Sequence, residues 1–96
     1  MPTRKEFIAQ LQERLGEVDG KLSAYEKKAR ALGRDARDEF SEEVNRIREQ
    51  KEQMLYTLTL LKGATESAFA DLRIGAQKAF RELKASFVAA KEHLDS

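Results

Sequence analysis

The chain has 96 residues, and its 18 Lys and Arg nearly balance its 17 Asp and Glu. This length predicts a single domain spanning residues 1–96 or part of an assembly, and the lack of cysteine excludes disulfides, thiolate metal ligands and cysteine nucleophiles. The net charge of +1, with no strongly basic segment, argues against nucleic-acid binding and against recruitment to anionic lipid by charge.

The N-terminal segment predicts the start of a helix and no export signal. Thr3 and Glu6 have the spacing of a capping box, in which the threonine hydroxyl accepts from the amide three residues later. The residues after Met1 lack the apolar run of a signal peptide. The longest apolar cluster, residues 54–61, is far shorter than the roughly 20 residues of a membrane-spanning helix. We therefore expect a cytoplasmic protein.

Apolar residues recur at steps of three and four from Ile8 to Leu94, with an average step close to the about 3.6 residues of a helical turn. This stripe predicts an all-α fold of long amphipathic helices, packed as a coiled coil or an antiparallel helical bundle. Only Lys51 and Thr65 interrupt the stripe with polar side chains. The side chains expected at the packing interface are large and apolar: Leu11, Leu15, Leu22, Val44, Ile47, Met54, Leu58, Leu61, Phe69, Leu72, Phe80, Leu83 and Phe87.

Two glycines are candidate breaks in this helical pattern. Each precedes a candidate helix cap, which is Asp35 after Gly33 and Thr65 after Gly63. A break at Gly63 alone gives one helix of about 60 residues, roughly 90 Å long. We favour this interpretation, because a glycine inside a helix costs only about 1 kcal/mol relative to alanine. Breaks at both glycines give instead a compact three-helix bundle, with helices over about residues 3–32, 34–62 and 64–95.

Few residues suggest catalysis or metal binding. His93 is the only histidine, and we interpret it as an exposed surface residue because no Glu-x-x-His pair of the di-iron type occurs. Carboxylates gather between Asp35 and Glu43, where a solvated helix face is the favoured interpretation and weak divalent-cation binding the alternative. No phosphate-binding loop, dinucleotide fingerprint or Ser-His-Asp arrangement is present. We expect no enzyme activity, no catalytic residue, no cofactor and no metal.

A short internal repeat marks the C-terminal segment. The sequence AFADLR at residues 68–73 recurs as AFRELK at residues 79–84, and this spacing is close to three full helical turns. Phe69 and Phe80 therefore nearly overlie on one helix face. We favour the interpretation that they fill the bundle core, because the opposite face carries mixed charge. The alternative is an amphipathic helix, residues 64–95, that lies on a membrane or lipid surface.

Four segments are distinctive: RKEFI at residues 4–8, Ile47-Arg48 within the charged middle, residues 64–75, and Ala79-Phe80. In these segments the chain resembles a group of small bacterial coiled-coil proteins that are often associated with stress responses and have no assigned molecular function. The resemblance covers nearly the whole chain. It implies a cytoplasmic, helical and stress-linked protein, and it supplies no catalytic residues.

These features predict a non-enzymatic structural or interaction protein that presents charged faces to partner proteins. A long helix would leave the apolar stripe uncovered in a monomer, so we expect a homo-oligomer that self-associates through the stripe. The alternative function is peripheral binding to a membrane, lipid or granule surface through residues 64–95.

Overall fold

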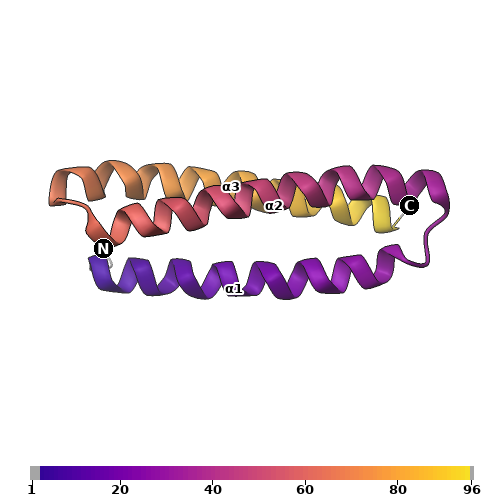
Figure 1. Ribbon diagram of the computed structural model, residues 1–96, viewed down its shortest axis with the longest axis horizontal. Coiled ribbons are helices and arrows are strands. Elements are labelled where there is room, and N and C mark those ends of the chain that lie inside the picture. The colour runs from indigo at the N-terminus through magenta and orange to yellow at the C-terminus, as the bar shows by residue number, and fades with distance from the viewer. Residues whose placement is uncertain (1–2, 96) are drawn as a thin grey trace.

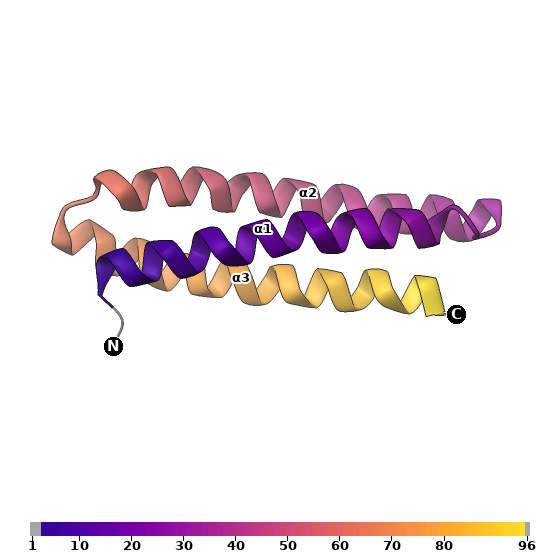
Figure 2. The same cartoon turned by 90° about the horizontal axis from the view of Figure 1, so that it is seen from below.

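The computed structural model describes residues 3–95, which form three helices joined by two short connections. They are α1 (Arg4–Ala29), α2 (Arg34–Gly63) and α3 (Glu66–Asp95), and no strand occurs among the described residues. The helices share one long axis in a rod of 49 × 19 × 17 Å, with α1 parallel to α3 and α2 running the opposite way (Figures 1 and 2). The prediction of an all-α helical bundle is confirmed.

The chain turns just before Gly33, so the favoured helix of about 60 residues does not form. The amides of residues 30–32 bond back to carbonyls three residues earlier, at 3.3, 3.1 and 3.0 Å, and so close the last turn of α1. Gly33 then has an extended backbone ahead of α2. Near this point the stripe residues are the small Ala29 and Ala36. Their side chains would bury little apolar surface if the helix continued through Gly33. Turning instead lets the whole of α1 pack against α2.

The predicted helix caps are confirmed at Thr3 and Thr65, whereas the one at Asp35 is wrong. The amide of Glu6 donates to the Thr3 hydroxyl at 3.2 Å, and the amide of Ala68 donates to the Thr65 hydroxyl at 3.3 Å. Asp35 lies inside the first turn of α2, where its negative charge faces the positive end of the helix dipole. Thr65, one of the two polar residues of the stripe, therefore marks the start of a helix.

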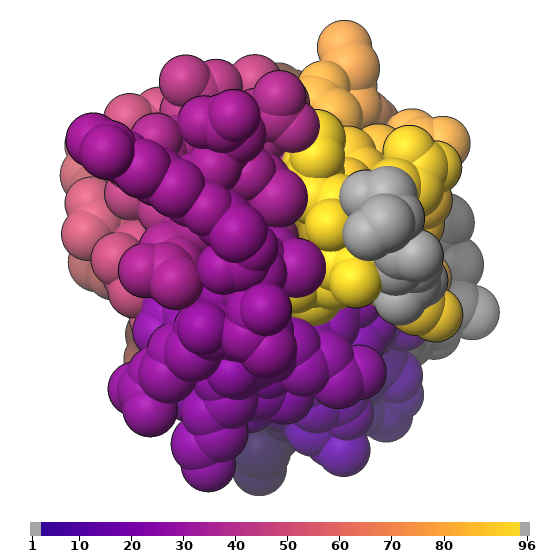
Figure 3. Space-filling model, turned by 90° about the vertical axis from the view of Figure 1, so that its right-hand side faces the viewer, coloured from indigo at the N-terminus to yellow at the C-terminus, as the bar shows by residue number. Residues whose placement is uncertain are grey.

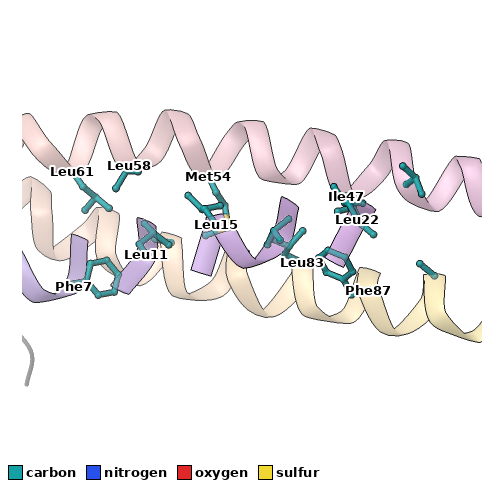
Figure 4. Close-up of a cluster of buried hydrophobic side chains, with 14 of the residues drawn as sticks. Phe7, Leu11, Leu15, Leu22, Ile47, Met54, Leu58, Leu61, Leu83 and Phe87 are labelled. Carbon is teal, nitrogen blue, oxygen red and sulfur yellow. The ribbon is translucent and has the colours of Figure 1, made fainter. Parts of the chain in front are cut away.

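The core is a column of apolar side chains along the bundle axis. Figure 4 shows side chains from all three helices converging on this column. Among the residues expected at the packing interface, Leu72 and Phe80 are half-buried and all the others are buried. The most deeply buried large side chains include Ile47 and Leu61, each with 0% of its surface exposed.

One phenylalanine occupies a core position next to the residue that the stripe selected. Phe7 is buried, whereas the stripe residue Ile8 is half-buried. A phenylalanine ring removes more apolar surface from water than isoleucine. The start of α1 is therefore rotated slightly from the expected orientation.

The three helices are not equally spaced. The backbones of α2 and α3 approach each other most closely, and those of α1 and α3 least. α3 places the small Ala76 and Ala90 in the core, and small side chains at a contact allow two helices to approach. α1 contributes larger side chains such as Phe7, Leu11 and Leu15. The seam between α1 and α3 is consequently the widest of the three.

Candidate interaction surface

A groove of about 560 Å³ follows the seam between α1 and α3. Its apolar floor consists mainly of Val18, Tyr25, Phe80, Leu83 and Phe87. Positively charged side chains line it and define what we call the basic groove: Arg14, Lys21, Lys84 and Lys91. Among the described residues, Glu17 is the only acidic one in the lining. The groove therefore combines an aromatic floor with a net positive charge.

Cations on α1 lie over phenylalanine rings on α3 at three successive levels. The Arg14 guanidinium carbon lies 5.3 Å from the centre of the Phe80 ring, and the Lys21 ammonium lies 5.4 Å from that of Phe87. Outside the groove, Arg4 lies 5.0 Å from the ring centre of Phe69. Such contacts contribute about 0.5–1 kcal/mol each at exposed sites. Because α1 and α3 are parallel, the repeat on α3 is matched by a similar spacing of cations on α1.

Ring-to-ring contacts join the same two helices. Phe7 and Phe69 meet edge to face, with ring centres 6.0 Å apart and an angle of 82° between the ring planes. Tyr25 and Phe87 meet in the same way at 5.7 Å and 80°. Edge-to-face pairs of this kind are the favourable geometry for aromatic rings. The aromatic face of α3 thus lies against α1, as expected if the repeated phenylalanines fill the core.

The outer face of α2 has the opposite charge. Exposed carboxylates recur along it at helical spacing and define what we call the acidic ridge: Asp35, Asp38, Glu42, Glu49 and Glu52. At the edge of the ridge, Arg46 is engaged in an ion pair with Glu43, at 3.2 Å. Toward the end of α2 the same face continues with Tyr56 and Leu60, which are 66% and 40% exposed. The ridge therefore joins an acidic stretch to an apolar one.

The acidic ridge and the basic groove lie on opposite sides of the bundle. Seen along the long axis, the magenta α2, the indigo α1 and the yellow end of α3 occupy three corners, so the outer face of α2 points away from the α1–α3 seam (Figure 3). These two surfaces thus differ in charge, although the net charge of the protein is only +1. Separation of this kind steers association with surfaces of complementary charge.

Ion pairs close the remaining seam between α1 and α2. Arg48 pairs with Glu26, and Lys51 pairs with Asp19. Lys51 is the second polar residue of the stripe, and its place at the edge of the core, with an acidic partner on α1, explains why a lysine is accommodated there. A hollow of about 320 Å³ near the α1–α2 turn includes Arg48 and Arg37 in its lining. Both arginines already have partners within the chain. Arg48 pairs with Glu26, and Arg37 donates to the Leu32 carbonyl at 3.2 Å.

His93 lies between two carboxylates of α2 instead of projecting freely into solvent. Its Nδ1 is 3.5 Å from Glu39 and its Nε2 is 4.0 Å from Glu43, and its side chain is 32% exposed. The carboxylates that cluster in the sequence are consequently divided, because Glu39 and Glu43 face α3 while the neighbouring Asp38 and Glu42 lie on the acidic ridge. Within residues 3–95, no three His, Asp or Glu side chains come together as a metal-binding group.

Comparisons of the chain with protein-family models, with curated proteins and with solved structures found no match. The resemblance to stress-associated coiled-coil proteins therefore stays a prediction. Within residues 3–95, no helix combines the length and the apolar character needed to cross a membrane.

Proposed function

We propose that this protein is a non-enzymatic structural or interaction protein that self-associates and binds other proteins through its charged outer faces. The observation that carries the proposal is the separation of charge between the acidic ridge on α2 and the basic groove between α1 and α3. Faces that differ in charge attract complementary faces and repel those of like charge, which gives a binding protein both rate and selectivity.

The mode of association differs from the one that the sequence suggested. In a three-helix bundle the apolar stripe is covered within a single chain, so it no longer requires a second copy. The force that remains available on the outside is electrostatic, supplemented by exposed apolar side chains such as Tyr56 and Val88. We therefore expect self-association that weakens as salt is added.

Sedimentation velocity over a range of protein concentrations tests this proposal. Between about 0.01 M and about 1 M salt the screening length falls from about 30 Å to about 3 Å, so the average mass is expected to exceed the monomer mass only at the lower salt. The monomer mass is 10.9 kDa. A mass that stays at this value at every concentration in both salts contradicts self-association.

A cytoplasmic location and a link to stress responses are part of the same proposal. Both rest on the resemblance to stress-associated coiled-coil proteins. Peripheral lipid binding through residues 64–95 would require Phe69 and Phe87 to leave the bundle, where both are buried. For this reason we favour association between proteins.

A further inference from the structure

We propose that the acidic ridge of one copy docks into the basic groove of a second copy. This inference rests on the proposed self-association and names the two surfaces that meet. The occupant is a second copy because the chain itself carries both halves of the contact. The ridge offers five carboxylates on one helix face, and the groove offers four cations above an aromatic floor. Like surfaces would repel: two ridges would face each other with carboxylates, and two grooves with cations.

The two surfaces lie at matching levels along the bundle. Lys21 lies between Asp19 and Glu26, whose ion-pair partners on α2 are Lys51 and Arg48. Lys21 is therefore nearly level with Glu49, which lies between those two partners in the sequence.

The cations and carboxylates also lie at matching levels near the other end of the groove. Lys91 lies two residues before His93, which contacts Glu39 and Glu43 of α2. Lys91 is therefore nearly level with Glu42. Two copies placed side by side in the same orientation, with no sliding along the axis, bring Glu42 toward Lys91 and Glu49 toward Lys21 and Lys84.

Apolar side chains adjoin both charged surfaces. Tyr56 follows the carboxylates of the ridge and is 66% exposed, and Val88 borders the groove and is 60% exposed. On each helix the two cations of the groove are seven residues apart, Arg14 and Lys21 on α1 and Lys84 and Lys91 on α3, which is about two helical turns. A contact limited to about two helical turns is expected to bury less surface than the about 800 Å² per partner that a stable complex buries. Each single contact is therefore expected to be weak.

The geometry of this contact is head-to-tail. Because ridge and groove lie on opposite sides, each docked copy still presents one free ridge or one free groove. A contact between two different surfaces does not close by itself and builds open rows unless its rotation closes a ring. We therefore expect a distribution of masses that grows with concentration and does not stop at a dimer.

Two charge-reversed variants test the inference. The ridge variant carries Glu42→Lys and Glu49→Lys, and the groove variant carries Lys84→Glu and Lys91→Glu; all four side chains are exposed. The ridge variant lowers the charge of the ridge from −5 to −1, and the groove variant changes the charge of the groove, with Glu17 counted, from +3 to −1. Each variant alone therefore loses most of the attraction between its two surfaces, and we expect its self-association at low salt to be more than about tenfold weaker than that of the wild type. An equimolar mixture restores complementary surfaces, so the mass in sedimentation velocity is expected to rise again.

Matched controls separate a specific contact from general attraction between oppositely charged proteins. The control for the ridge variant is Glu13→Lys with Glu82→Lys, and that for the groove variant is Lys27→Glu with Lys78→Glu, all at exposed positions. Each control alone is expected to associate like the wild type. Helical circular dichroism checks the folding of every variant, and Glu42→Gln with Glu49→Gln replaces the ridge variant if the reversed form does not fold.

The outcomes distinguish this inference from the proposed function. If the wild type associates and the ridge or groove variant associates equally well, or if the mixture does not restore association, the docking of ridge into groove is overturned while self-association stands. Controls that lose association as the variants do lead to the same conclusion. A wild type that stays monomeric at low salt overturns both. A monomeric protein whose groove binds poly-glutamate also overturns the docking of a second copy.

Discussion

Phe7 of α1 and Phe69 of α3 form an edge-to-face pair with ring centres 6.0 Å apart, close to the end of the bundle where both helices begin. Both rings are buried, and the Arg4 guanidinium lies over the Phe69 ring. This pair joins the two helices that are otherwise most widely spaced. We infer that it sets the register between α1 and α3.

Replacement of the buried ring tests this role. Phe69→Ala is expected to lower the free energy of unfolding by about 3 kcal/mol, because it removes a buried ring and leaves a cavity. Phe80→Ala is the matched comparison from the other copy of the repeat, and we expect a loss of about half that size because Phe80 is only half-buried. Urea unfolding followed by circular dichroism measures both. Equal losses would contradict the assigned difference in burial.

Arg4 connects the start of α1 to the end of α2. Its Nη2 donates to the carbonyls of Leu61 at 2.9 Å and Lys62 at 3.2 Å, which are among the last carbonyls of α2; the Leu61 carbonyl also accepts from the Ala64 amide at 3.5 Å. Arg4→Lys keeps the charge and loses the planar fork, so we expect a loss of about 1 kcal/mol in the free energy of unfolding. Lys5→Ala, at an exposed neighbouring position, is expected to change stability by less than about 0.5 kcal/mol. A similar loss in both variants would argue against the two hydrogen bonds.

Gly16 and Gly20 lie on the exposed outer face of α1, and a Cβ atom added at either position meets nothing within 4 Å. Their backbones are helical. Alanine at each position is therefore expected to stabilise the protein by about 0.5–1 kcal/mol, because glycine has more backbone entropy to lose on folding. Thermal unfolding of the double variant checks this expectation. A lower melting temperature would show that the small size of these residues is needed on the outside of α1.

The turn between α1 and α2 does not depend on the special conformations of glycine. Gly33 has φ −64° and ψ 166°, which any residue can adopt, and no residue among 3–95 has a positive φ. Gly33→Ala is therefore expected to keep the three-helix bundle. Small-angle scattering at high salt checks the result, because the bundle is 49 Å long, whereas an unbroken helix through residue 33 would approach roughly 90 Å. A maximum dimension near the larger value would show that the glycine itself breaks the helix.

The fold class followed from the apolar stripe, since a period of about 3.6 residues is a property of the helical backbone. The turn before Gly33 could not be settled in the same way. Locally, a glycine within a helix costs about 1 kcal/mol, a small amount beside the long-range packing of α1 against α2, which no local pattern contains. Long-range packing also accounts for the difference between Ile8, which the stripe selected, and Phe7, which the structure buries. Phe7 contacts Phe69, and this contact joins parts of the chain that are far apart in the sequence.

The two charged surfaces differ in how visible they are in the sequence. The ridge could have been found, because Asp35, Glu42 and Glu49 recur at seven-residue spacing and so share one helix face. The groove could not, because Arg14 and Lys84 come from helices far apart in the chain that only the fold brings together. Summing charge over segments hides both surfaces, because the charges of one face are added to those of the other faces of the same helix.

An odd number of antiparallel helices leaves the start of α1 and the end of α3 at opposite ends of the molecule (Figure 1). A fluorophore or a fused domain attached at each end would therefore be held apart along the long axis of the rod. Tension applied at these two ends would act parallel to the helix axes. The covalent chain would transmit it through α1, α2 and α3 in turn.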